Sequence, residues 1–298
     1  MNLIRNHTSL GSLILAATLL AAPAPSRADI LYVSTSLNNT IEKYESVTGA
    51  DLGAFANTCL NCPYGLAFDN AGNLYAANYG DSTIARFTPG GVGSIFASTG
   101  LYYPYGLAFD ASGNLYAANT FANMIEKFTP AGVGSVFASS GLSWPCGLAS
   151  DRAGNLYAAN FNNDSIAKLT PEGVGSLIGY RDLFYPAGLA FDTAGNLYVA
   201  NCWSHGTIDK FTPDGVASVF ASSGLDHPYG LAFDSAGNLY AANRGDNTIE
   251  KFTPDGVGSV FATGLSSPYF IAIQQVPEPS TWALLALPAL LAFRRPKA

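Results

Sequence analysis

The chain has 298 residues, of which 48% are apolar and only 12% are charged, so most of it must be packed rather than solvated. Between Asp29 and Gln275 there are 20 acidic and 9 basic residues, a formal charge of −11. Such a surface lacks the clustered lysines and arginines with which proteins bind nucleic acid, so we exclude nucleic acid as a partner.

Residues 1–28 have the features of a secretory signal peptide. Arg5 supplies the positive start, an apolar run extends from Leu10 to Ala22, and Ser26-Arg27-Ala28 has the small-x-small pattern of a cleavage site. An N-terminal membrane anchor is the alternative, although the apolar run is short for a membrane span. We therefore expect export and cleavage near Ala28.

A segment that begins at Pro63 repeats along the rest of the chain. In its first copy it reads Pro-Tyr-Gly-Leu-Ala-Phe-Asp at 63–69 and Leu-Tyr-Ala-Ala-Asn at 74–78. The opening proline recurs every 40 to 42 residues, at Pro104, Pro145, Pro186, Pro228 and Pro268. A period in this range is typical of propellers and other repeat arrays.

Each repeat predicts four short strands, which in the first copy are residues 65–69, 74–78, 83–88 and 92–97. The third of them alternates apolar and charged residues, as a half-exposed strand does. The turn from Asp69 to Asn73 joins the first two strands. There the Asp69 carboxylate can accept backbone N–H groups, and Gly72 can take a positive φ.

The two ends of the repeat region complement each other. Residues 31–56 match only the last three segments of a repeat, and residues 268–274 match only the first. We therefore predict an all-β, six-bladed β-propeller with four-stranded antiparallel blades, in which N- and C-terminal strands share one blade and close the ring. An open solenoid is the alternative, but it needs caps rather than two halves that fit each other.

The motif Pro-x-Gly-Leu-Ala-Phe-Asp-x-x-Gly-Asn-Leu-Tyr-Ala-Ala-Asn resembles the NHL repeat and its six-bladed relatives over Asp29 to Gln275. The resemblance implies the fold. Relatives of this shape include protein- and RNA-binding domains, sugar lactonases and a streptogramin lyase. The resemblance to this family therefore does not identify the function.

Two sets of repeated residues are expected on the face that carries the blade-to-blade connections and the loops between second and third strands. We predict ligand binding there by Tyr64, Tyr105, Tyr229 and Tyr269, by Asn78, Asn119, Asn160, Asn201 and Asn243, and by Trp203. A structural role for the asparagines, bonding the backbone at strand ends, is the alternative. Departures from the repeat add further candidates: Cys146, Ala187, Cys202, His205, Arg244, Tyr102, Tyr103, Trp144, Phe184, Tyr185 and His227.

The four cysteines predict disulfides, because an even number in an exported protein more often means bridges than a metal or redox site. We expect a Cys146–Cys202 bridge between neighbouring blades and a local Cys59–Cys62 bridge. We predict no catalytic residues, no metal and no cofactor, since no Gly-x-Ser-x-Gly, phosphate-binding loop or His-Glu-x-x-His motif is present.

The C-terminus carries a second export signal. Pro277, Glu278 and Pro279 precede an apolar run from Trp282 to Phe293, which a basic end follows. This order resembles the PEP-CTERM sorting signal of Gram-negative bacteria. The resemblance implies recognition by an exosortase-type processing protease, transient membrane contact through the segment, and delivery to the cell surface or extracellular matrix.

We thus divide the chain into a signal peptide (1–28), an NHL-type propeller (29–275) and a sorting segment (276–298). The predicted function is that of an exported, non-catalytic binding or structural propeller of a Gram-negative cell surface or matrix. Its partner is expected to be an extracellular polysaccharide or a surface protein, held on the loop face. A propeller enzyme of the lactonase or streptogramin-lyase type is the alternative.

Overall fold

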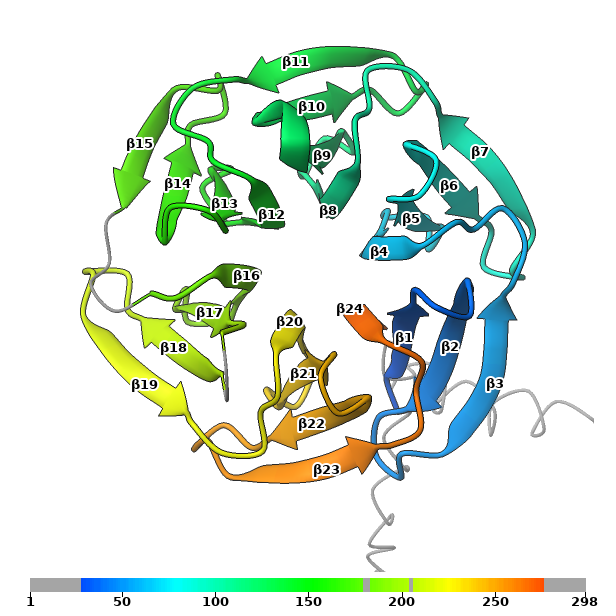
Figure 1. The fold of residues 1–298 in the computed structure, drawn as a ribbon, viewed down its shortest axis with the longest axis vertical. Coiled ribbons are helices and arrows are strands. Elements are labelled where there is room, and N and C mark those ends of the chain that lie inside the picture. Colours follow the sequence, from blue (N-terminus) through cyan, green and yellow to red (C-terminus); the bar gives the residue numbers. More distant parts are fainter. Residues whose placement is uncertain (1–27, 179–182, 204–205, 276–298) are drawn as a thin grey trace, which may run out of the picture. The chain divides into compact units, whose positions relative to one another are not determined.

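The computed structural model describes residues 28–178, 183–203 and 206–275. In these ranges the chain forms 24 β-strands and one short 3-10 helix, η1 (Thr120–Ala122). The strands make six four-stranded sheets that surround a central axis (Figure 1). The chain is thus an all-β, six-bladed propeller, which confirms the predicted fold class. No helix in the described ranges is long and apolar enough to cross a membrane.

Five blades are contiguous in sequence, and each runs outward from the axis. Blade 1 contains β4 (Pro63–Phe68), β5 (Leu74–Asn78), β6 (Thr83–Phe87) and β7 (Gly93–Ala97). Blade 2 contains β8 (Pro104–Phe109), β9 (Leu115–Asn119), β10 (Met124–Phe128) and β11 (Gly134–Ala138). Blade 3 contains β12 (Pro145–Ser150), β13 (Leu156–Asn160), β14 (Ser165–Leu169) and β15 (Gly175–Ile178). Blade 4 contains β16 (Pro186–Phe191), β17 (Leu197–Asn201), β18 (Thr207–Phe211) and β19 (Ala217–Ala221). Blade 5 contains β20 (Pro228–Phe233), β21 (Leu239–Asn243), β22 (Thr248–Phe252) and β23 (Gly258–Ala262).

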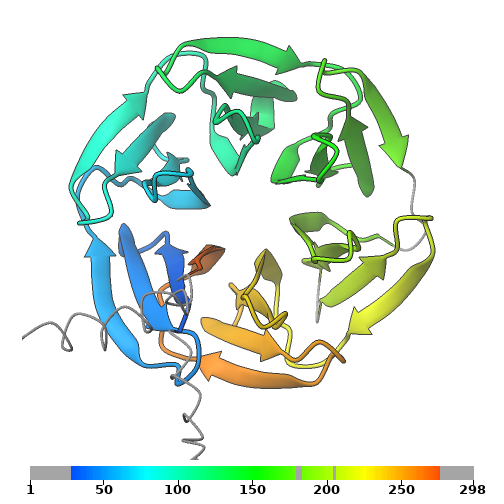
Figure 2. The ribbon, with the colours of Figure 1, turned by 180° about the vertical axis from the view of Figure 1, so that it is seen from behind.

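Blade 6 joins the two ends of the propeller. Its strand order is β24-β1-β2-β3, with β24 (Pro268–Gln274) innermost, followed by β1 (Ile30–Thr35), β2 (Thr40–Glu45) and β3 (Asp51–Ala56). The pairing of β24 with β1 is antiparallel, from Ile30 opposite Gln274 to Val33 opposite Ile271. Seen from either side, the orange β24 lies beside the blue β1 (Figures 1 and 2). The predicted ring closure is confirmed.

The turns between first and second strands form as their sequence predicts. Asp69 Oδ1 accepts the backbone N–H groups of Ala71 at 2.9 Å and Asn73 at 2.8 Å. Gly72 has a φ of +79°, which is strained for residues with a Cβ. The same carboxylate bonds recur at Asp110, Asp151 and Asp192, so the repeated Asp-x-x-Gly-Asn is a turn motif.

The innermost strands approach one another so closely that glycine is required in them. A Cβ on Gly147 in β12 would lie 2.2 Å from the carbonyl oxygen of Ala187 in β16. Equivalent backbone contacts surround the axis at Gly65, Gly106, Gly188 and Gly230. The repeated glycine of the first strand therefore sets how tightly the blades pack.

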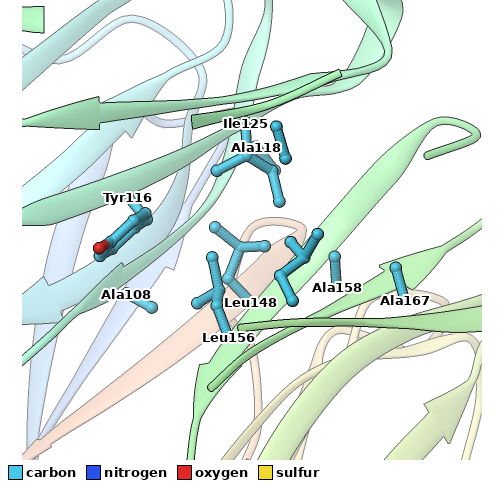
Figure 3. Close-up of a cluster of buried hydrophobic side chains, with 10 residues drawn as sticks. Ala108, Tyr116, Ala118, Ile125, Leu148, Leu156, Ala158 and Ala167 are labelled. Carbon is cyan, nitrogen blue, oxygen red and sulfur yellow. The ribbon is translucent and has the colours of Figure 1, made fainter. Parts of the chain in front are cut away.

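Hydrophobic cores lie between neighbouring blades. Figure 3 shows the one between blades 2 and 3, where Tyr116, Ile125 and Leu148 are buried with alanines of β9, β13 and β14. In other interfaces a Phe at the end of the inner strand packs against a Tyr of the preceding blade, as Phe109 does against Tyr75 at 5.0 Å. Ser150 replaces this Phe in blade 3, and its hydroxyl donates to the Phe109 carbonyl oxygen at 3.3 Å.

Both predicted export signals lie almost entirely outside the described residues. The signal peptide lies in residues 1–27, apart from Ala28, and Pro277, Glu278 and Pro279 lie beyond the last described residue.

Candidate binding site on the loop face

The side of the propeller where each inner strand begins and each second strand ends is called the loop face. It carries the connections between blades and the loops between second and third strands. The opposite side, which carries the Asp-x-x-Gly-Asn turns, is the turn face.

The four predicted tyrosines meet at the axis on the loop face. The Tyr64 and Tyr269 rings are stacked with centroids 3.9 Å apart, Tyr269 lies 4.9 Å from Tyr229, and Tyr229 lies 6.3 Å from Tyr105. Tyr105 and Tyr229 are each only 8% exposed. Tyr105 packs against Tyr64 at 4.7 Å and Tyr229 against Tyr269, so both predicted residues are buried among the axial rings.

A pocket of about 190 Å³ opens above this cluster. Aromatic rings from five blades make most of its wall, and no aspartate or glutamate contributes. The lining residues are Tyr64, Tyr79, Tyr105, Thr120, Phe121, Trp144, Cys146, Phe161, Tyr229 and Tyr269. Small pockets of this kind, apolar with a few polar tips, are where proteins hold small ligands or parts of larger ones.

Burial keeps the tyrosine hydroxyls of this pocket protonated. It raises the pKa of Tyr105, Tyr229 and Tyr64 far above the usual value, and that of Tyr269 above it as well. They are therefore neutral hydrogen-bonding groups at any physiological pH. The positive charge nearest to them is Arg244, whose guanidinium lies 5.3 Å from the Tyr269 ring centroid and 5.8 Å from that of Tyr229.

Exposed and half-buried aromatic side chains continue from the pocket across blades 1 to 4. We call them the aromatic arc: Tyr79, Tyr103, Phe121, Trp144, Phe161, Tyr185 and Trp203. Ring contacts divide the arc into two groups, of which one contains Phe121, 5.3 Å from Trp144, and the other contains Tyr185, stacked on Trp203 at 4.9 Å. Phe121, Trp144 and Trp203 are 41%, 39% and 61% exposed.

The arc ends at blades 5 and 6. The residue that precedes the repeat proline is aromatic in Tyr103, Trp144 and Tyr185, but it becomes His227 and Ser267 in the last two connections. The residue after the repeated asparagine changes likewise from Tyr79 and Phe161 to Arg244. The loop face is therefore asymmetric, although the fold is nearly sixfold.

The backbone holds the arc in a strained conformation. Tyr103, Trp144 and Tyr185 have φ values of +51°, +48° and +50°, a region that side chains with a Cβ rarely adopt, least of all before proline. Side chains of the preceding loop fix them: the Trp144 N–H donates to Asn123 Oδ1 and the Tyr185 N–H to Asp164 Oδ1, both at 2.7 Å. Cys62, His227 and Ser267 have the same positive φ before the other repeat prolines, so this conformation belongs to the connection between blades and not to the aromatic side chains.

The five predicted asparagines have a structural role. Each is at most 3% exposed. Asn160 is representative: its Oδ1 accepts the Ser143 N–H at 3.0 Å, and its Nδ2 donates to the Gly141 carbonyl oxygen at 3.0 Å and to Ser165 Oγ at 3.1 Å. Asn78, Asn119, Asn201 and Asn243 accept from the equivalent loop N–H. These amides hold the connecting loops onto the blades. Few of their hydrogen-bonding groups are left for a ligand, so the asparagines are not part of the candidate site.

Neither predicted disulfide is formed in the structure, where all four cysteines are free. Cys59 Sγ lies 3.4 Å from the position that a Cβ on Gly93, in the outer strand β7, would take. Cys146 and Cys202 are both buried in the axial cluster, as their predicted common rim requires, and burial raises the pKa of Cys202 to about 11.

Sequence reasoning missed Tyr79, Phe121 and Phe161. A signal was present, since all three follow the repeated asparagine within two residues at positions that differ between repeats. Trp203, which was predicted, is at the end of the arc. His205 lies outside the described residues, and within them no group of three His, Cys, Asp or Glu side chains could hold a metal ion.

A larger pocket of about 470 Å³ lies on the turn face, lined in part by Asp151, Asp192 and Asp234. Their carboxylates already accept the hydrogen bonds of their own turns, as Asp192 does from Asn196 N at 2.8 Å and Asn196 Nδ2 at 2.6 Å. These bonds, acting against burial, lower the pKa of Asp192. These aspartates therefore stabilise the turns of the propeller.

Comparisons with known proteins agree with the fold. A chain in the crystal structure of a nidogen/laminin complex is 22% identical, with a TM-score of 0.73 over 83% of this chain and 98% of that chain. A streptogramin B lyase is 16% identical, with a TM-score of 0.66 over 84% and 88%. A catalytically inactive virginiamycin B lyase from Staphylococcus aureus, solved with quinupristin, is 15% identical, with a TM-score of 0.63 over 84% and 94%. No protein-family profile and no curated protein matches the chain.

At these identities the likeness establishes the fold alone. The chain belongs to the class of β-propellers with six blades, and its function must be argued from the loop face.

Proposed function

We propose that this protein is an exported binding propeller, which attaches to a glycan or another protein of the cell surface or extracellular matrix through its loop face. The observation that carries the proposal is the aromatic arc beside an apolar pocket, on one face of blades 1 to 4. Exposed aromatic rings with polar tips dominate binding energy where they cluster, and large exposed apolar patches mark interaction sites.

The location rests on the two ends of the sequence. We propose removal of residues 1–28 on export, and processing at Pro277-Glu278-Pro279 by an exosortase-type protease after transient membrane contact. We propose that in an oxidising compartment a bridge forms between Cys146 and Cys202, which are buried in the same axial cluster. The N-terminal sequence of the exported protein, and retention of a variant with all three sorting residues changed to Ala, test the location.

Binding is tested with exposed members of the arc, because changing the buried tyrosines would open cavities in the core. Phe121→Ala and Trp203→Ala should each weaken attachment to extracted cell-surface material by over tenfold, about 1.4 kcal/mol. Val219→Ala on the outer strand β19 is the matched control, since Val219 is also exposed and apolar but lies on another surface. If the arc variants bind as well as the Val219 variant does, this face is not the binding site.

The alternative, a propeller enzyme of the lactonase or lyase type, has only the fold likeness in its favour. No feature of the described loop face distinguishes a reaction from binding, so we propose no catalytic residue.

A further inference from the structure

We infer that the ligand of the loop face is an uncharged sugar chain, with one pyranose ring in the axial pocket and further units stacked along the aromatic arc. This inference rests on the proposed function and names the chemical class of its ligand.

Charge selects against two other classes. Aromatic pockets often bind organic cations, but here Arg244 already lies over Tyr269 and Tyr229, and no carboxylate lines the pocket to balance a second positive charge. A polyanion would meet a propeller with a formal charge of −11 between Asp29 and Gln275, so long-range repulsion opposes it. A neutral ligand avoids both costs.

The size and the chemistry of the pocket suit a sugar ring. Its volume of about 190 Å³ lies below that of pockets for drug-sized molecules, roughly 300–1,000 Å³, so it holds one ring. A pyranose presents apolar C–H groups on its faces and hydroxyls at its edge. The wall of the pocket contains both kinds of group, because the rings of Phe121, Trp144 and Phe161 lie in it together with the neutral hydroxyl-bearing side chains of tyrosines and Thr120.

The arc suits a chain rather than a single sugar. Successive connections around the face bring Tyr103, Trp144 and Tyr185 to equivalent positions. Tyr103 reaches Trp144 through Phe121, and Tyr185 contacts Trp203, so the rings form two groups on the same face. The exposed rings are flat platforms that accept any stacked ring without needing its exact substituents.

The test uses polysaccharide extracted from the surface of the producing cells, digested with protease and separated by anion exchange into neutral and acidic fractions. We expect the full-length protein to bind the neutral fraction, with binding that changes less than twofold between 50 and 500 mM salt. Phe121→Ala and Trp203→Ala should each weaken this binding over tenfold, and Val219→Ala less than twofold. For fragments of the neutral fraction, Phe121→Ala should weaken the binding of disaccharides and hexasaccharides alike, and Trp203→Ala that of hexasaccharides only.

Each other outcome overturns the inference in a distinguishable way. Binding to the acidic fraction alone, or competition by millimolar tetramethylammonium, would refute the charge argument. Binding that disappears on protease digestion would identify a protein partner and leave the proposed function intact. If neither the intact extract nor its fractions bind, the proposed function fails together with the inference.

Discussion

Stability should depend on pH through Glu250, a buried carboxyl group in β22. Its side chain is 4% exposed, no hydrogen bond from the described residues reaches its carboxylate, and Gly224 and Gly258 lie against it. Burial, with a smaller contribution from the negative charge of Asp246, raises the pKa of Glu250 from 4.5 to about 7. Between these two values the folded protein keeps a proton that the unfolded chain has lost, so stability falls as the pH rises from 4.5 to 7.

The magnitude follows from the shift. The rise in pKa from 4.5 to about 7 corresponds to a loss of about 3 kcal/mol in the free energy of unfolding. This loss is absent below pH 4.5 and complete above pH 7. Glu250→Gln is neutral at every pH, so the variant should match the wild type at pH 4.5 and be more stable by up to about 3 kcal/mol at pH 8. Urea denaturation at pH 4.5, 6, 7 and 8 measures the difference.

Two further variants make this test specific. Glu172→Gln removes the same formal charge from an exposed turn, so it controls for the net charge of the protein. Glu126 has the position of Glu250 in β10 and a pKa that burial also raises, so Glu126→Gln should change stability in the same direction. A Glu250→Gln variant whose stability difference from the wild type is the same at pH 4.5 and pH 8 would refute the reasoning.

Three other predictions concern the framework. Gly147→Ala should cost at least about 3 kcal/mol in urea denaturation, because its Cβ would lie 2.2 Å from a backbone oxygen of the next blade; a milder effect would mean that the inner strands can separate. Asn160→Ala should cost about 3 kcal/mol by the same assay, since a loop N–H and a carbonyl oxygen lose their partner, whereas an unchanged midpoint would return this residue to the candidate site. Deletion of Pro268–Gln274 exposes the edge of β1 and should abolish the cooperative thermal transition followed by circular dichroism, unlike deletion of residues 276–298; a retained transition would contradict the closed ring.

Much of the fold could be predicted because its determinants are local and repeated. The turn at Asp69 to Asn73 depends on a carboxylate, its own backbone and one glycine, all within five residues, so its chemistry is visible in the sequence. The partial repeats at the two ends predicted which strand closes blade 6. The C-terminal repeat has only a first strand, and the N-terminal repeat lacks that strand, so the one can pair in the place of the other.

The site was less predictable, because its residues are near each other only in the ring. Sequence position identified Tyr105 and Tyr229 as axial but not as buried, since their exposure depends on how closely six inner strands converge. A role in the loops and a role in ligand binding were both open for the repeated asparagines. The hydrogen bonds of Asn160, which reach across 17 to 19 residues, show that the connecting loop occupies both ends of its amide.

The sequence by itself determined six blades, their strands and turns, and the closure of the ring, because short-range hydrogen bonding and period alone specify them. Only the tertiary structure decided that Phe121 packs against Trp144 in the wall of a pocket, and that Tyr185 stacks on Trp203 on the same face. These rings come from different repeats, and their contacts depend on the angle between blades and on the backbone strain before each proline. Neither quantity is encoded within a single repeat.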